Sequence, residues 1–225
     1  MQHSVIINDI SVNLRQNPRA RKIIIKIRHG EVDLVIPRWG SLKRALKFFD
    51  SKQDWVRNRL AHQPSKIPLQ IGSILPVLDI SRETTYGCMR GKSLITEDKI
   101  IINGDPALAG NKIKKVVSEY LKAELTKMVE QNARALRVKY KKIVIRDNVT
   151  RWGSCSSKGT LSFSWRIAFA PRSVVEYLAA HEVAHLAEMN HGKRFWQIVE
   201  QLDPGYEVAE HWLKQNGNRL HLYQQ

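Results

Sequence analysis

The sequence predicts an α+β protein with a β-rich N-terminal domain that holds one helix, followed by a mainly helical domain with a small sheet. Apolar and polar residues alternate over much of the first 105 positions, as in strands that bury one face. Beyond them, apolar residues recur at helical spacing from 111 to about 138, and three further helical segments follow Pro171. We therefore expect two domains, covering residues 1–106 and 107–225.

Two hairpins and one helix are expected to open the N-terminal domain. An Asn8-Asp9 turn and a His29-Gly30 turn separate runs that alternate like strands. Ser41 is suited to cap a helix that continues to about residue 60, because apolar residues recur there at helical spacing. The strand-like runs before and after this helix cover residues 5–7, 10–14, 22–27, 32–36, 69–80, 84–89, 92–96 and 99–102.

The boundary between the domains is placed at the Asn-Gly-Asp-Pro breaker of residues 103–106. Two short strands are expected beyond the long helix, at 142–146 and 159–165, and serines alternate with apolar residues in the second of them. Pro171 suits the first turn of a helix that runs to about residue 188. Further helices are expected at 193–202 and 206–215. No internal repeat is visible in the sequence.

Composition places the chain among folded proteins that need no disulfide bonds. It is 43% hydrophobic and 26% charged, which excludes disorder and low-complexity structure. Its two cysteines, Cys88 and Cys155, lack CxxC spacing and are interpreted as free thiols. Neither a run of about 20 apolar residues nor a basic leader with an apolar core is found, so we expect no membrane association and a cytoplasmic protein.

The charge is strongly positive and unevenly distributed. The net charge is +16, of which residues 1–110 contribute +8, residues 111–170 contribute +10 and residues 171–225 contribute −2. Such a balance favours an anionic substrate or partner, although a solvated cationic surface without a ligand explains it equally well. No nucleic-acid-binding motif accompanies the charge, so a nucleic-acid partner is unsupported by the sequence.

The pattern that carries chemistry is His181-Glu182-Val183-Ala184-His185, an HExxH motif within a predicted helix. Histidines four positions apart lie on one helix face, so both imidazoles can reach one metal ion. Glu182, beside the first histidine, can then address a water bound to the metal. Zinc suits imidazole ligands, and a catalytic zinc site keeps three protein ligands and one open position.

The third ligand is expected after the helix, and His191 is the preferred candidate. It follows His185 by six positions, between Asn190 and Gly192, which favour the end of a helix and a change of direction. The rivals lie in a later predicted helix, because one class of zinc peptidases takes a glutamate from there. These rivals are Glu207, Glu210 and His211.

The motif spacing also occurs in metzincins, but Glu188 stands where their glycine is needed and no methionine follows residue 189. The chain instead resembles the YgjP-like family of predicted zinc metallopeptidases, relatives of the SprT-like proteases. The segments that carry this resemblance are NPRARK at 17–22, VIP at 35–37, SLKRAL at 41–46, RWGSCS at 151–156, LSF at 161–163, AP at 170–171, HEVAH at 181–185, His191, and FW at 195–196.

The resemblance implies a zincin-like catalytic domain behind a β-rich domain, with His181, His185 and His191 as metal ligands and Glu182 as base. Three functions are considered. The first is a zinc-dependent hydrolase that cleaves peptide or protein substrates. The second is a metal-dependent hydrolase of nucleoside triphosphates, of the pyrophosphatase type, favoured by the basic segment beside the site. The third is a non-catalytic zinc-containing module that binds nucleic acid or protein. Glu182 argues against this third function, because such a module does not need a carboxylate beside an incomplete ligand set. Another divalent metal, and the oligomeric state, stay open.

Further residues near the motif have both functional and structural interpretations. The strand at 159–165 is a candidate to pair with an extended substrate, or it is an ordinary core strand. Arg151 can stabilise an oxyanion or bind a phosphate, or it can pair with a carboxylate, and Trp152 is a candidate core residue. Cys155 can approach the metal as a thiolate or can be an idle thiol.

Two signals in the N-terminal domain are rejected as ligand sites. The segment 87–93 resembles a phosphate-binding loop, but three residues separate its glycines where four are required, and a strand follows. The basic residues between Arg19 and Arg28 alternate partly with isoleucines, which favours the solvated face of a strand over a nucleic-acid patch.

Overall fold

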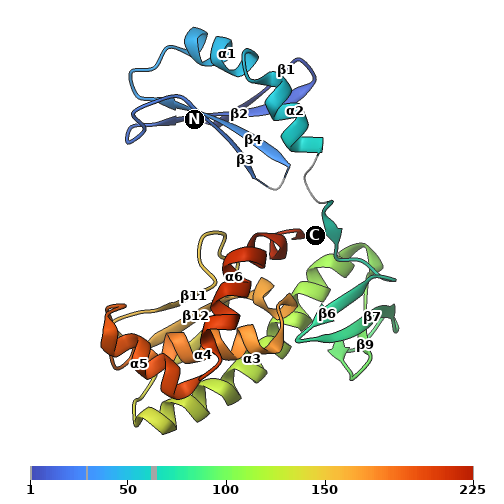
Figure 1. Cartoon of the computed structure of the whole chain (residues 1–225). Coiled ribbons are helices and arrows are strands. Elements are labelled where there is room, and N and C mark those ends of the chain that lie inside the picture. The colour runs from blue at the N-terminus through green and yellow to red at the C-terminus, as the bar shows by residue number, and fades with distance from the viewer. Residues whose placement is uncertain (1, 29, 62–64, 225) are drawn as a thin grey trace. The chain divides into compact units, whose positions relative to one another are not determined.

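The computed structural model describes the whole chain except residues 1, 29, 62–64 and 225. It divides into two compact units, residues 1–66 and 67–225, and both contain helices and strands (Figure 1). The predicted α+β class is confirmed.

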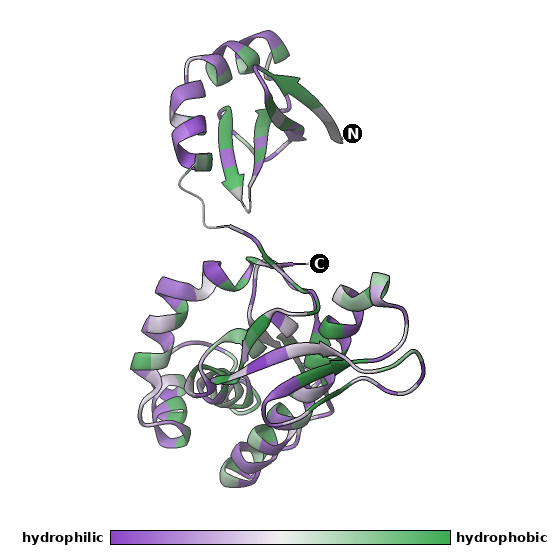
Figure 2. Cartoon of the chain, turned by 90° about the vertical axis from the view of Figure 1, so that its right-hand side faces the viewer, coloured by the Kyte–Doolittle hydropathy of each residue, from purple (hydrophilic) through white to green (hydrophobic). Residues whose placement is uncertain are grey.

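The first unit is a four-stranded sheet covered on one face by two helices. Its elements are β1 (Gln2–Ile7), β2 (Ile10–Asn17), β3 (Ile24–Arg28), β4 (Glu31–Pro37), α1 (Leu42–Asp50) and α2 (Gln53–Ala61). The strand order is β1-β2-β4-β3, with β2 and β4 parallel and the two outer pairs antiparallel. Hydrophobic residues alternate with hydrophilic ones along these strands, whereas the helices are mostly hydrophilic (Figure 2).

One helix was expected between residues 41 and 60, and the structure has two. Helix α1 ends where Ser51 donates its hydroxyl to the Phe48 carbonyl and its backbone N–H to Lys47, and Lys52 donates its N–H to Phe49. Short polar side chains such as serine compete with the helical backbone for hydrogen bonds, which favours this break. Both helices still bury an apolar face on the sheet, through Phe49 from α1 and Val56 from α2.

The second unit begins with a sheet of similar size and continues into the helical part of the chain. The first elements are β5 (Ile67–Pro68), β6 (Ile74–Val77), β7 (Ile80–Tyr86), β8 (Leu94–Ile95), β9 (Lys99–Ile102) and the short 3₁₀ helix η1 (Pro106–Leu108). The strand order of the four-stranded sheet is β6-β7-β9-β8, and β5 instead pairs with β13 (Tyr223–Gln224) near the C-terminus.

The two four-stranded sheets share one connectivity. In each sheet, the first two strands form an antiparallel hairpin, and the fourth strand of the module pairs parallel with the second. The third strand pairs antiparallel with the fourth and forms the other edge of the sheet. Both first hairpins turn on two residues with positive φ, Asn8-Asp9 at 47° and 65° and Leu78-Asp79 at 50° and 65°, as two-residue hairpin turns require. The structure therefore contains a repeated module that the sequence analysis does not detect.

The boundary between the compact units lies after Lys66, whereas the Asn-Gly-Asp-Pro breaker predicts a domain boundary at residue 106. The second sheet belongs with the helices because Ile100 and Ile102 share one apolar core with Ile113 and Val117 of the following helix. The breaker at 103–106 only turns the chain from β9 into η1, where the Asp105 carboxylate accepts a hydrogen bond from Ala107.

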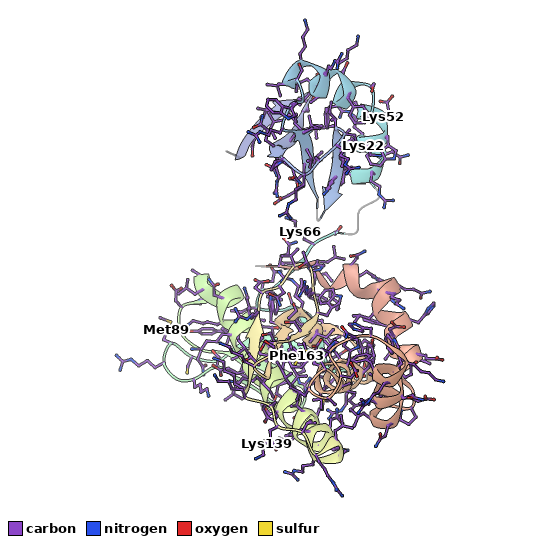
Figure 3. All side chains as sticks on the ribbon, turned by 90° about the vertical axis from the view of Figure 1, so that its left-hand side faces the viewer. Lys22, Lys52, Lys66, Met89, Lys139 and Phe163 are labelled. Atoms are coloured by element: carbon purple, nitrogen blue, oxygen red, sulfur yellow. The ribbon has the colours of Figure 1, made fainter. Side chains whose placement is uncertain are left out.

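The remaining elements form the part of the second unit that carries the HExxH motif. They are α3 (Ala109–Leu136), β10 (Lys142–Arg146), β11 (Gly153–Cys155), β12 (Thr160–Ser164), the 3₁₀ helix η2 (Trp165–Phe169), α4 (Arg172–Ala184), α5 (Lys193–Leu202) and α6 (Tyr206–Leu220). The sheet order is β10-β12-β11. Phe163 of β12 is fully buried inside this unit, whereas Met89, in the loop between β7 and β8, is 66% exposed (Figure 3).

Helix α4 lies against α3, α5 and α6 and is buried over most of its length, so its motif sits within the core of the unit. Within the described residues, no helix is both long enough and apolar enough to cross a membrane.

Candidate metal centre

Helix α4 fixes two of the three predicted histidines. Its apolar residues Val174, Leu178 and Val183 are buried, which sets the rotation of the helix in the core. His181 and His185 lie one turn apart, and their ring centroids are 5.0 Å from each other. His185 is only 9% exposed, and His181 is partly buried.

The turn after α4 brings His191 to the same point. The Gly192 N–H donates to the Asn190 carbonyl across 2.7 Å, and α5 begins immediately afterwards. The Nε2 atoms of His191 and His181 are 3.1 Å apart, and one ligand atom from each of the three histidines lies within 4.8 Å of the others. Two nitrogens bound to one tetrahedral zinc would lie about 3.3 Å apart, so the His181–His191 pair is already spaced for a shared metal ion.

A buried aromatic ring packs against all three imidazoles. Phe195 of α5 is fully buried, and its ring centroid lies 4.9 Å from that of His181, 4.5 Å from that of His185 and 4.6 Å from that of His191. Its contact with all three rings restricts their rotation, which is how a ligand set is held ready for a metal.

The rival residues are not part of this group. Glu207, Glu210 and His211 line a separate cavity of about 380 Å³ together with Trp196 and Tyr206. Among the residues that the structure describes, the three histidines are the one group of at least three side chains whose ligand atoms lie close enough to hold a metal.

Hydrogen bonds orient two of the imidazoles. His185 donates from Nδ1 to the backbone carbonyl of Glu188 across 3.2 Å, which leaves its Nε2 lone pair free. The Tyr177 hydroxyl lies 3.3 Å from His181 Nδ1, so the Nε2 atom of that ring is likewise the one that faces His191. Such second partners fix the tautomer that a metal ligand needs.

The electrostatics keep these rings neutral. Burial, together with the neighbouring His185 and His191, lowers the pKa of His181 to about 4. The pKa of His185 is also lowered, mainly by burial. A neutral imidazole has a free lone pair, so the site presents the protonation state that binds a metal at neutral pH.

Glu182 is the buried carboxylate of the site and lies against strand β11. It is 3% exposed, and its Oε2 atom has no hydrogen-bond partner among the described residues. A Cβ atom at Gly153 would lie only 2.3 Å from Glu182 Oε1, so the carboxylate occupies space that any other residue at 153 would fill. Burial raises the pKa of Glu182 to about 8, and the positive charge of Arg151 partly opposes this rise.

Cys155 shares the strand face of Gly153, because side chains two positions apart on a strand point to the same side. Burial raises the pKa of its thiol to about 11, and the negative charge of Glu182 contributes. At neutral pH the thiol is therefore protonated, which does not favour the thiolate role considered for this residue.

Of the two interpretations of the strand at 159–165, the structure supports the ordinary core strand. β12 is hydrogen-bonded to β10 on one side and to β11 on the other, so neither of its edges is open. Alternating serines cannot distinguish an edge strand from a central one, and here Ser162 and Ser164 are both buried. The edge of this sheet beside Glu182 is β11.

Arg151 and Trp152 have different surroundings. Arg151 is exposed, and its charge acts on the Glu182 carboxylate. Trp152 packs on His221, with ring centroids 4.7 Å apart, and its indole lies against Gly217. Trp152 thus joins β11 to α6, in agreement with its interpretation as a core residue.

Sequence reasoning did not assign Tyr177, Gly153 or Phe195 to the site. Tyr177 stands four positions before His181, and this helical spacing was an available signal. Gly153 and Phe195 lie in the segments that carry the family resemblance, but their contacts depend on packing between distant elements.

Three imidazoles that converge on one point beside a buried carboxylate are typical of metal-dependent hydrolases. The family model of the YgjP-like metallopeptidase domain matches residues 21–216, and the chain belongs to this family. The predicted resemblance is thereby confirmed, and the protein is a metal-dependent hydrolase of the metallopeptidase type.

Two solved structures are similar to part of the chain. The metallopeptidase zymogen abylysin of Pyrococcus abyssi has 24% identity and a TM-score of 0.38, over 43% of this chain and 95% of that one. The metallopeptidase zymogen jannalysin of Methanocaldococcus jannaschii has 18% identity and a TM-score of 0.37, over 41% of this chain and 95% of that one. No match was found among curated proteins.

Proposed function

We propose that this protein is a zinc-dependent peptidase in which His181, His185 and His191 hold the metal and Glu182 is the base. The observation that carries the proposal is the convergence of three ligand atoms within 4.8 Å beside a carboxylate that is 3% exposed. Three imidazoles leave a fourth position open in a tetrahedral zinc site, as catalysis requires.

In the proposed hydrolysis, the metal and the protein side chains have different roles. A bound zinc ion supplies a coordinated water with a pKa near 7 and polarises a substrate oxygen. Glu182 accepts the proton of the attacking water and returns it to the departing amine, for which a carboxylate with a raised pKa is suited. Gly153 leaves the space in which this carboxylate lies.

The substrate in this proposal is a peptide in extended conformation along β11. The Ser164 N–H donates to Trp152 and the Ser156 N–H donates to Thr160, which fixes the register of the β11–β12 pair. In an antiparallel pair, hydrogen-bonded positions alternate, so the peptide groups of Gly153 and Cys155 face away from β12. They are the donors and acceptors with which an added strand would pair.

The test is cleavage of casein by zinc-loaded protein, with the metal content measured on the same samples. Wild type is expected to cleave casein, and E182Q is expected to bind zinc equally but to lose cleavage by about a thousandfold or more. E207Q, a change at an exposed carboxylate in the neighbouring cavity, is the control and should retain both properties.

Nucleoside triphosphates are assayed in parallel. Phosphate release that is lost in E182Q, without casein cleavage, would contradict the peptidase assignment in favour of nucleotide hydrolysis. A zinc-loaded E182Q variant with wild-type turnover would contradict the role of Glu182.

A further inference from the structure

The first unit brings two basic loops to one end of its sheet. Strands β2 and β4 are parallel, and Asn17 at the end of β2 lies opposite Pro37 at the end of β4. The segments that follow these strands therefore leave the sheet from the same end. We call the exposed residues that they carry the basic loop face: Arg19, Arg21, Lys22, Arg38, Trp39, Lys43 and Arg44.

Both segments are fixed turns. After β2, the Asn17 carbonyl accepts the N–H of Ala20, and its side-chain oxygen accepts the N–H of Arg19. After β4, the Gly40 N–H donates to Pro37, and a Cβ at Gly40 would lie 2.8 Å from Ile36. The basic loop face is thus presented by ordered backbone.

The charge of this unit is concentrated and unbalanced. Residues 1–66 contain 14 lysines and arginines and 5 acidic residues, and no acidic residue occurs at 10–30 or 34–49. Within the described part of the chain, no cation of the basic loop face forms an ion pair, whereas Arg15 on the sheet pairs with Asp33. Unpaired cations on adjacent turns create a local positive potential that attracts polyanions.

Trp39 supplies a flat apolar surface among these charges. Its side chain is 89% exposed, more than any other large hydrophobic residue that the structure describes, and the Arg38 guanidinium lies 5.1 Å from its ring centroid. An exposed indole flanked by cations is the combination on which proteins stack the bases of unpaired strands while cations track the phosphates.

We infer that the basic loop face binds single-stranded nucleic acid, with a base stacked on Trp39 and the backbone phosphates held by the surrounding arginines and lysines. A membrane surface fits less well, because insertion needs several apolar side chains at one depth. Beside Trp39 the face carries cations, and the nearest exposed apolar residue, Leu42, is half exposed.

This activity is separate from the proposed peptidase, since all of its residues lie in the first unit and the histidines lie in the second. Nucleic-acid binding is therefore expected in the metal-free protein and in E182Q, and its test does not depend on whether the protein is a peptidase.

The test is the fluorescence anisotropy of a labelled oligodeoxythymidine titrated with the full chain. W39A is expected to weaken binding by about 5- to 150-fold, because stacking of one base contributes about 1–3 kcal/mol. W39F, which keeps a ring, should retain most of the affinity. W55A is the matched control, because Trp55 is 52% exposed in the same unit but lies on α2.

The contribution of the loops is tested by charge reversal. R19E/R21E should weaken binding further and lower the salt dependence of affinity by about one unit of slope per lost phosphate contact. K52E is the control, because Lys52 follows α1 near the β1–β2 turn, and the two ends of β2 are about 23 Å apart.

Three results would overturn the inference. The first is wild-type affinity in W39A, and the second is an equal loss of affinity in K52E and R19E/R21E. The third is binding to phosphatidylserine vesicles without binding to the oligonucleotide.

Discussion

The two four-stranded sheets have the same connectivity but different packing partners. The first is covered by its own helices and carries exposed cations and Trp39 on its end loops. In the second sheet, hydrogen bonds hold the corresponding loops in place. Asn103 accepts one hydrogen bond from the backbone N–H of Cys88 and another from the ammonium group of Lys112. That sheet instead shares its core with α3 and supports the part of the chain that holds the histidines.

The comparison teaches that connectivity alone does not set the role of a module. What packs on the sheet decides which groups are left free, and the two units therefore place their functional groups differently. In the two proposals, the second unit acts through buried groups and the first through exposed groups. Each prediction below alters one kind and leaves the other unchanged.

The largest effect is expected from H185A. Loss of one of three imidazoles should remove most of the bound metal and reduce casein cleavage by about a thousandfold or more. Metal content and turnover are measured together, and oligonucleotide affinity should not change. H211A serves as the control, because His211 lies outside the ligand group. Full zinc retention in H185A would contradict its role as a ligand.

The next effect is steric and comes from G153A. The added methyl group would lie 2.3 Å from Glu182 Oε1, so the carboxylate must move away from its position beside the histidines. Displacement of a catalytic group by about 1 Å can cost about a hundredfold in rate, so we expect a loss of that size with metal retained. G205A is the matched control, since a Cβ there would make only an ordinary contact, 3.6 Å from Asp203 Oδ1. Equal kcat values for the two variants would argue against this contact.

The third prediction concerns the stability of metal-free protein against pH. The pKa of Glu182 is raised from 4.5 to about 8 by burial. Between these values the folded state binds more protons than the unfolded state, so stability falls as pH rises through this window. E182Q has no such titration. The free energy of unfolding is measured by urea denaturation for both proteins. Relative to wild type, E182Q should become more stable by about 2–3 kcal/mol between pH 5 and 7, because only wild type loses stability in this range. A difference that is constant with pH would show that Glu182 is already ionised.

The smallest effect is expected at Cys155. Its pKa of about 11 arises from burial and from the charge of Glu182, so removal of that charge should increase the thiolate fraction. In a C88S background, which leaves a single thiol, E182Q should speed alkylation by iodoacetamide severalfold above pH 8, where Glu182 of the wild type is ionised. Alkylation at unchanged rate would indicate that burial alone sets this pKa.

The grouping of the three histidines could be predicted because they are close in sequence. His181, His185 and His191 fall within eleven residues, and helical spacing plus one turn brings them together. Strand alternation and helix periodicity likewise located most elements, since these patterns are local.

The relations that failed depend on contacts between distant segments. Nothing in the sequence of β12 shows that β10 and β11 occupy both of its edges, and the space at Gly153 is defined by a side chain 29 positions away. The breaker at 103–106 has the composition of a linker, yet the residues on either side of it share one core. The sequence also does not show that Arg19 and Trp39 lie at the same end of one sheet, because the parallel pairing of β2 with β4 is not a local property.

The central claim, that three imidazoles hold the metal and leave one position open, is tested most directly by X-ray absorption at the zinc edge of the zinc-loaded protein. We expect three nitrogen neighbours at about 2.0–2.1 Å and one further oxygen from water, with one nitrogen lost in H191A. A sulfur neighbour at about 2.3 Å, or a spectrum unchanged by H191A, would contradict the account.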